Sequence, residues 1–241
     1  MVTLLFTGDN TTVNTYLWGA MLTQTNALTQ YTQTIASAVN NGQVRGITAQ
    51  QQNLLKYSED FTQSGTWTQV AISSVSANTI ANPINGLVNV SGLVATNVNT
   101  THNIQQVITY TLGLTYTFSV YVKAGNQNWL LIEGNNNGTF YCYFNITSGS
   151  GAIGSLAGVI PTIKTLPNGW FLCTITYTPT VATCNPSIWS ATANGNAIFT
   201  GDNATINTYV YGAMLTQSNG LTEYAQTTSS TINNGSIRVL T

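Results

Sequence analysis

Few side chains in this chain of 241 residues could do acid–base or nucleophilic chemistry. Hydrolysis of a glycosidic bond needs two carboxylates at a controlled separation, and nucleophilic catalysis needs a nucleophile beside a positioned base. Glu59 and Asp60 are neighbours on an expected strand, so their side chains should point to opposite faces and not form such a pair. The chain has six carboxylates, which are Asp9, Glu59, Asp60, Glu133, Asp202 and Glu223.

The single histidine, His102, lies in the sequence NTTHNIQ at the start of an expected strand. No cysteine or carboxylate is near it in the sequence, so we expect a solvated side chain and not a catalytic one. With no pair of candidate catalytic groups, the sequence predicts that the chain is not an enzyme.

The three cysteines, Cys142, Cys173 and Cys184, are too few and too far apart for a disulfide framework or a zinc site. We expect them to be small buried hydrophobic residues. Residues 149–154 have the glycine spacing of a dinucleotide-binding loop, but the sequence SLAGVIPTIK that follows predicts a turn and a strand, whereas the motif requires a helix. We therefore expect a glycine-rich hairpin turn there.

Charge is scarce in this chain. Charged residues make up 5% of it, where roughly 25% is usual, and the net charge is −1. Five basic side chains cannot neutralise a run of phosphates, so we expect no nucleic-acid partner. No stretch approaches 18 consecutive apolar residues, so we expect no membrane insertion. The first residues, MVTLLFTGDN, lack the features of a signal peptide.

Alternating apolar residues predict strands throughout. They occur at Tyr116–Val122, at Phe140–Ile146 and at Phe171–Tyr177, and clusters of Gly, Asn and Ser separate them. No segment has a convincing helical period. Many short strands at regular spacing predict an all-β fold, a two-sheet antiparallel jelly-roll sandwich.

The chain repeats its own C-terminal part. Residues 6–48 align without a gap with residues 199–241, at an offset of 193, and 27 of the 43 positions are identical. Such a period suits a whole domain. We therefore expect residues 1–48 to be the C-terminal part of a preceding repeat, 49–52 a linker, 53–228 the jelly-roll domain, and 229–241 a tail or linker to a next copy. This arrangement indicates tandem copies in a longer parent or ancestor.

The N-terminal partial copy contains a strand that is apolar on both faces, TVNTYLWGAML. Such a strand belongs inside a sandwich, and a lone strand is not stable in water. One interpretation is that it packs on a neighbouring copy, by strand addition or in an intertwined oligomer, so that other copies of the chain are its partners. The other is that it docks on its own domain.

Five sequence blocks, in the right order, resemble one family. They are NLLKYSEDF followed by Trp67, TYTFSVYVKA, NGWFLCT, YVYGAMLTQ and LTEYAQTTSSTI. Together they are similar to the carbohydrate-binding-module-like jelly-roll domains of bacteriophage tail and fibre proteins. The resemblance implies a jelly roll, frequent tandem copies and a place on the virion surface, outside the host cell, and it supplies no catalytic residues.

Two positions depart from this family's pattern. Thr216 stands where the family has a glutamate, and Leu172 stands where it has an arginine.

The resemblance also implies a possible metal site. Relatives of this sandwich type often hold a structural calcium near the first strand, which makes Glu59 or Asp60 conceivable ligands. We expect no other cofactor.

A binding face follows from the alternation of the strands. If Phe118 and Cys142 face the core, the opposite face carries aromatic and polar residues, and these share one surface if the strands run as a meander. Rings stack on apolar sugar faces while polar groups bind hydroxyls. The predicted carbohydrate-binding residues are Tyr121, Trp129, Glu133, Tyr141 and Tyr143, beside Lys123 and Asn145. The alternative is that these aromatic residues pack under a loop, on a neighbouring subunit or as cross-strand pairs.

Three further aromatic residues, Trp67, Trp170 and Tyr211, are assigned to packing. The sequence thus predicts a non-enzymatic phage tail-fibre or decoration domain on the virion surface. It would adhere to host-surface glycan, assemble a fibre, or do both. Two alternatives remain at this point, a purely structural fibre or decoration protein and an accessory binding module of a larger enzyme.

Overall fold

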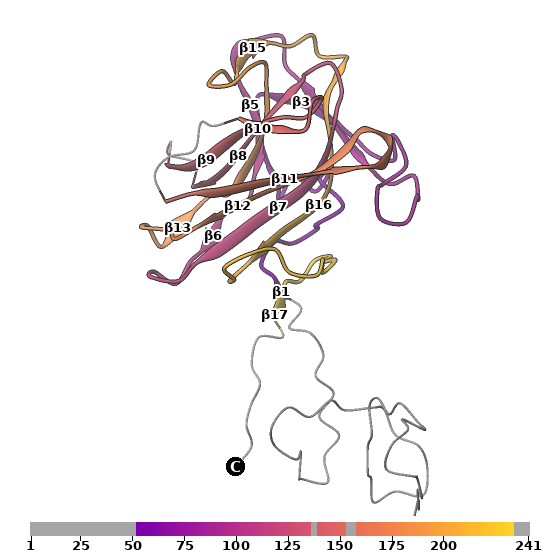
Figure 1. Ribbon diagram of the computed structural model, residues 1–241. Coiled ribbons are helices and arrows are strands. Elements are labelled where there is room, and N and C mark those ends of the chain that lie inside the picture. Colours follow the sequence, from indigo (N-terminus) through magenta and orange to yellow (C-terminus); the bar gives the residue numbers. More distant parts are fainter. Residues whose placement is uncertain (1–51, 136–138, 153–157, 234–241) are drawn as a thin grey trace, which may run out of the picture. The chain divides into compact units, whose positions relative to one another are not determined.

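The described part of the chain is an antiparallel β-sandwich. The computed structural model describes residues 52–135, 139–152 and 158–233, which form seventeen strands and one 3-10 turn (Figure 1). This confirms the all-β fold class. The expected partial copy at 1–48 lies outside the described residues, as do 49–51 and 234–241. In the described part of the chain, no helix is long or apolar enough to cross a membrane.

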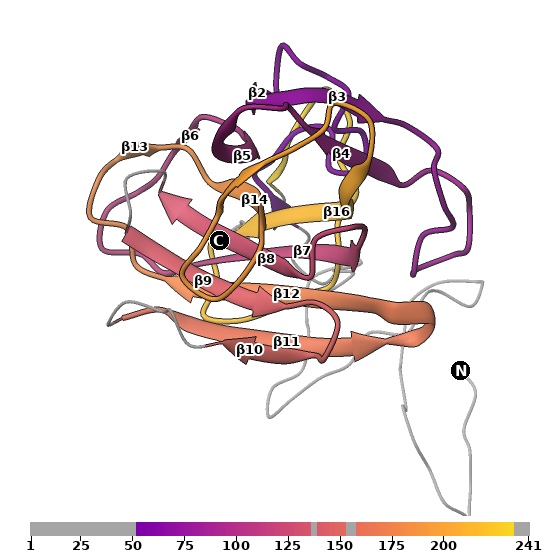
Figure 2. The same cartoon turned by 90° about the horizontal axis from the view of Figure 1, so that it is seen from above.

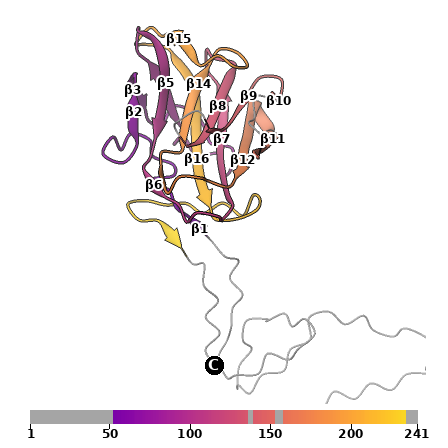
Figure 3. The ribbon, with the colours of Figure 1, turned by 90° about the vertical axis from the view of Figure 1, so that its left-hand side faces the viewer.

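Sheet I has seven strands in the order β10-β9-β8-β14-β5-β15, with β2 also paired to β5. Figure 3 looks onto this sheet, and β5, β14, β8, β9 and β10 follow one another across it. Its strands are β2 (Thr68–Val70), β5 (Asn99–Gln105), β8 (Trp129–Asn135), β9 (Thr139–Asn145), β10 (Ser150–Ala152), β14 (Ser187–Ala191) and β15 (Ile198–Thr200).

Sheet II has six strands in the order β11-β12-β7-β16-β4-β3. Figure 2 shows β2 and β3 at one edge of the sandwich and β10 and β11 at the opposite edge. The 3-10 turn Pro167–Gly169 joins β11 to β12. The strands are β3 (Ile72–Ser76), β4 (Ser91–Ala95), β7 (Tyr116–Ala124), β11 (Ile160–Leu166), β12 (Trp170–Tyr177) and β16 (Ile206–Thr216).

Two short ladders complete the fold. β6 (Ile108–Thr109) pairs with β13 (Thr183–Cys184), and β1 (Gln52–Asn53) pairs with β17 (Ile232–Asn233). The second ladder brings the first and the last described strand side by side at one pole of the domain (Figure 1).

The core fills the space between the sheets, and strand alternation selects its members. Phe118 and Val120 of β7, Ile175 of β12, and Ile132 and Phe144 of sheet I are fully buried. All three cysteines are buried and free, as the sequence predicts. The three aromatic residues assigned to packing are also buried, namely Trp67, Trp170 and Tyr211.

The meander on which a single predicted binding surface depends is interrupted at one connection. β7 belongs to sheet II, whereas β8 and β9 belong to sheet I. The chain crosses between the sheets at 125–128, where the backbone N–H groups of Gly125 and Gln127 both donate to the carbonyl oxygen of Asn207, at 3.1 Å. A Cβ at Gly125 would lie 2.2 Å from the carbonyl oxygen of Ile206, so only glycine permits this close approach.

His102 is fully buried, so the expectation of a solvated side chain is wrong. Its strand β5 lies inside sheet I, where it pairs with β14 and β15 on one side and β2 on the other. The imidazole lies between two backbone carbonyl oxygens, with Nδ1 2.7 Å from that of Ala71 and Nε2 2.9 Å from that of Phe199. His102 therefore ties β5 to its neighbours and has a structural environment.

Candidate functional site

Aromatic side chains gather on the outer face of sheet I. This face is opposite the core because Trp129, Tyr141 and Tyr143 alternate with the buried Leu130, Cys142 and Phe144. The rings of Trp129, Tyr141 and Trp189 are half-buried, so part of each meets solvent. We call this cluster the aromatic face; its residues are Trp129, Leu131, Tyr141, Tyr143, Trp189, Ala191 and Ala197.

The strand register arranges these side chains in rows across the sheet. Tyr143, Leu131, Trp189 and Asn103 are successive cross-strand partners on β9, β8, β14 and β5. In the adjacent row Trp129 lies opposite the small side chain of Ala191. Trp129 and Trp189 are therefore diagonal neighbours, whose Cα atoms such register places about 7–8 Å apart. We call these two half-buried indole rings on the outer face the platform.

A row of hydrogen-bonding groups lies beside this platform. Tyr141, Glu133, Ser187 and Gln105 are cross-strand partners on the same four strands. The Glu133 side chain is 3% exposed. Burial raises the pKa of the Tyr143 phenol, and the nearby Tyr141 and Glu133 raise it further. The platform is thus bordered by the half-buried Tyr141 phenol and Gln105 amide, with the Glu133 carboxylate and the Ser187 hydroxyl buried between them.

Trp189 is a member of this face that the sequence analysis did not select. Its indole nitrogen donates a 2.6 Å hydrogen bond to the hydroxyl oxygen of Ser187, which fixes the orientation of the ring. The sequence pattern that could have placed Trp189 on this face is the segment SIWSA, in which the tryptophan alternates with the buried Ile188 and Ser190. A strand of five residues offers too few alternations to be decisive by itself.

Asn103 ends the first row beside Trp189. The residue is 1% exposed. Its side-chain oxygen has no hydrogen-bond partner within the described part of the chain. A buried oxygen without a donor costs about 1–3 kcal/mol. A hydroxyl or water that reached this oxygen would therefore be bound favourably.

Tyr121 does not belong to the aromatic face. It is on β7 of sheet II, because the chain changes sheets after β7, and its side chain points away from the core on the opposite side of the sandwich. There its ring centroid lies 6.3 Å from that of Tyr211 and 6.1 Å from that of Tyr224. Of the five predicted residues, the structure brings together Trp129, Glu133, Tyr141 and Tyr143 and separates Tyr121.

Glu59 and Asp60 border a cavity of about 340 Å³ beside sheet II. The expected strand does not form here, because Tyr57 adopts a positive φ of 50° and the chain bends. The expected strand is therefore wrong, and with it the reason for placing the two side chains on opposite faces; both line this cavity.

Hydrogen-bond donors already occupy the oxygens of these two carboxylates. Glu59 accepts from Tyr224, Gln226 and Asn89. Burial raises the pKa of Asp60, but hydrogen bonds from Thr62 and Gln63 outweigh it and the net shift is downward. A calcium ion needs those oxygens as ligands. In the described residues no group of three or more His, Cys, Asp or Glu could hold a metal ion. This arrangement does not fit the calcium that the resemblance implies.

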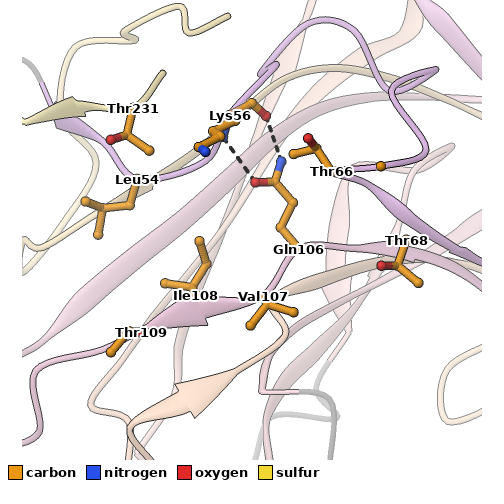
Figure 4. Close-up of a pocket in the computed structure, with 10 residues that line it drawn as sticks. Leu54, Lys56, Thr66, Thr68, Gln106, Val107, Ile108, Thr109 and Thr231 are labelled. Carbon is orange, nitrogen blue, oxygen red and sulfur yellow. Dashed lines mark hydrogen bonds between the residues drawn. The ribbon is translucent and has the colours of Figure 1, made fainter. Parts of the chain in front are cut away.

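A second cavity, of about 430 Å³, lies near the pole where β1 and β17 pair. Gln106 spans its wall: the Lys56 backbone N–H donates to Oε1 at 3.1 Å, and Nε2 donates to the Lys56 carbonyl oxygen at 2.7 Å (Figure 4). The remaining walls are aliphatic or threonine side chains, with no aromatic ring. This cavity lacks the stacking surface of the aromatic face, and we assign it no ligand.

Comparison with solved structures gives only weak similarity. No known protein family matches the sequence, and no curated protein matches it. A solved structure similar to this chain is the enzymatically active domain of tailspike protein 4 of bacteriophage CBA120, with a TM-score of 0.37 and 14% identity. The match covers 68% of this chain and 21% of that chain, so the present chain spans only about a fifth of that structure. No residue role is carried over from it.

The same comparison corrects one prediction. The matched domain is described as enzymatically active. The prediction that the present chain is not an enzyme does not stand against this finding, and we withdraw it. The resemblance to carbohydrate-binding-module-like jelly rolls stays a prediction.

Proposed function

We propose that this chain is a virion-surface module of a phage tail protein and that its aromatic face binds a host-surface saccharide. The observation that carries the proposal is the arrangement of Trp129 and Trp189 as diagonal neighbours with part of each ring in solvent. Sugar rings have apolar faces that stack on such rings. The five sequence blocks that resemble phage tail and fibre jelly rolls support the place on the virion.

The chemistry of the face also favours a saccharide. Its border carries the Tyr141 phenol, the Glu133 carboxylate and the Gln105 amide, which together donate and accept hydrogen bonds. Of the charged side chains in sheet I, Glu133 is the only one that the described residues place on this face. We therefore expect a ligand that carries hydroxyl groups and little negative charge.

The proposal is tested by binding of the full chain to purified bacterial surface polysaccharides, immobilised as an array and followed by calorimetry. Trp129→Ala and Trp189→Ala should each weaken binding by about thirtyfold, the effect of removing an aromatic hot spot of about 2 kcal/mol. Tyr209→Ala is the matched control, because Tyr209 is a half-buried aromatic residue on the outer side of sheet II. Equal losses in all three variants would contradict the proposal, as would binding that none of them changes.

A further inference from the structure

The sandwich is completed by the last part of the chain. Residues 199–233, which we call the closing segment, contain the end of β15, all of β16 and an arm that leads to β17. β16 lies between β7 and β4 within sheet II. Its inward side chains Val210, Ala213 and Leu215 are fully buried in the core. Without this segment sheet II would be divided and the core exposed.

Nine side chains of the closing segment form hydrogen bonds to the rest of the domain. Asn207 accepts from the backbone N–H of Ala95 at 2.6 Å and donates to Asn126 at 2.8 Å. Tyr224 and Gln226 donate to Glu59 at 3.1 and 3.0 Å. The nine are Asn203, Asn207, Thr208, Tyr211, Thr216, Tyr224, Gln226, Thr227 and Asn233.

The internal repeat preserves these anchoring side chains. Eight of the nine are identical 193 positions earlier, whereas only 27 of 43 positions are identical in the repeat as a whole. The ninth, Tyr211, corresponds to Trp18, whose indole N–H is also a donor. Gly212, which has a positive φ of 57°, corresponds to Gly19. The eight identical equivalents are Asn10, Asn14, Thr15, Thr23, Tyr31, Gln33, Thr34 and Asn40.

The substitutions between the two copies fall at positions where they should change the stability of the sandwich little. Exposed positions such as Ala204 and Thr228 change freely, and the core position Val210 becomes the similar Leu17. The one buried small residue that gains a larger, polar equivalent is Ala225, which corresponds to Thr32. Residues 6–40 therefore carry the side chains needed to complete a sandwich of this kind.

We propose that residues 6–40 are a second closing segment, which takes the place of residues 199–233 in the sandwich of another copy of the chain. The same ladder and hydrogen bonds form in either case, so the free energy of the exchange is small. A copy's own segment is favoured in dilute solution, because tethering gives it a millimolar effective concentration. Copies crowded on a particle exchange segments instead. Because the contact is head-to-tail, repetition gives a ring or a fibre.

The test uses an acceptor chain in which both segments are disabled. Leu17→Asp combined with Val210→Asp places a charge at the same core position of each segment, and an unpaired buried charge is strongly destabilising. This acceptor is refolded together with an equal amount of wild-type chain, and in parallel with the Leu17→Asp chain as the matched control. We expect folded acceptor in a mixed complex, seen by analytical ultracentrifugation, with wild type only. Equal recovery with both donors, or none with either, overturns the proposal.

A second measurement uses chains that fold by themselves. Met214 is the cross-strand partner of Ser119 on β7, so Met21 of a donor should take that position. Facing residues in an antiparallel ladder lie within disulfide distance. A Ser119→Cys chain mixed with a Met21→Cys chain should form at least fivefold more disulfide-linked dimer than the same chain mixed with Thr11→Cys, whose equivalent Ala204 is exposed. The absence of this excess also overturns the proposal.

Discussion

The indole nitrogen of Trp189 donates a 2.6 Å hydrogen bond to the hydroxyl oxygen of Ser187, two residues away on the same face of β14. Ser187 is fully buried, so the bond is shielded from water. It holds the ring in one orientation beside Leu131 and Glu133. The Trp189 ring of the platform is therefore ordered by the chain itself, and an ordered side chain lowers the entropic cost of binding.

Loss of this hydrogen bond should loosen the platform. Ser187→Ala removes the acceptor and leaves the indole N–H without its partner, which costs about 1 kcal/mol. We expect saccharide affinity to fall by about fivefold, measured by calorimetry, while the fold persists. Ser187→Thr keeps a hydroxyl and is the control that should retain more affinity. If alanine and threonine behave alike, the hydrogen bond does not position Trp189.

The charge of Glu133 should be detectable on Tyr143. Burial raises the pKa of the Tyr143 phenol first, and the negative charges of Tyr141 and Glu133 disfavour the phenolate further. Glu133→Gln removes one negative charge, so the pKa of Tyr143 should fall. An NMR titration of the labelled tyrosine rings measures this, with Tyr121 on sheet II as the internal control. A rise, or an equal change at Tyr121, would contradict the assigned geometry.

Gly212 allows the bulge at which β16 passes β7. Its φ is +57°, and a Cβ there would lie 2.9 Å from Cδ2 of Tyr121. Gly212→Ala should lower the free energy of unfolding by about 2 kcal/mol, because a left-handed conformation costs other residues roughly 1–2 kcal/mol. Urea unfolding measures it. Gly65→Ala, where a Cβ would meet nothing within 4 Å, should change stability by less than about 0.5 kcal/mol. Equal effects at both glycines would refute this account of the bulge.

Asp202 should make stability depend on pH at acidic values. Hydrogen bonds from the Thr205 hydroxyl and backbone, and from the Ala204 backbone, lower the pKa of Asp202 from 3.8 to about 2. A carboxyl group with a lowered folded pKa stabilises above its unfolded pKa, and the effect disappears as pH falls through the folded value. Asp202→Ala should therefore melt below wild type at about pH 6.

This difference in melting temperature should narrow between about pH 4 and pH 2. Thr205→Val, which removes the hydroxyl donor, should reproduce part of the same pH dependence. A difference that stays constant down to about pH 2 would show that the carboxylate is not stabilised in this way. Asp9, the equivalent carboxylate in the repeat, is not mutated in either variant, so it contributes equally to all the melting curves.

The alternation of apolar and polar residues predicted which side chains of β7, β8, β9 and β12 face the core. It could do so because successive side chains of a strand point to opposite faces of its sheet. It did not predict which strands share a sheet. The connection at 125–128 is short enough for a hairpin, but it crosses to the other sheet, where Gly125 and Gln127 bond to Asn207, 82 and 80 residues later. Tyr121 was misplaced for that reason.

The errors at His102 and Glu59 have the same origin. A polar side chain on a strand is solvated or buried according to what packs over it, and for His102 these are Ala71 and Phe199, far away in sequence. Glu59 follows a residue with positive φ, Tyr57, which nothing in its own type requires. Contacts with residues far away in the sequence determine the surroundings of these two side chains, and the local sequence pattern does not contain that information.

The central claim is that the aromatic face binds the saccharide, and the tryptophan side chains of the chain itself provide the most direct test. In an NMR titration of the full chain with a polysaccharide fragment that binds, each indole N–H gives a separate signal. We predict that the signals of Trp129 and Trp189 shift, while those of Trp67 and Trp170, buried elsewhere, stay in place. Shifts confined to Trp67 and Trp170, or saturable binding that leaves Trp129 and Trp189 unchanged, would contradict the claim.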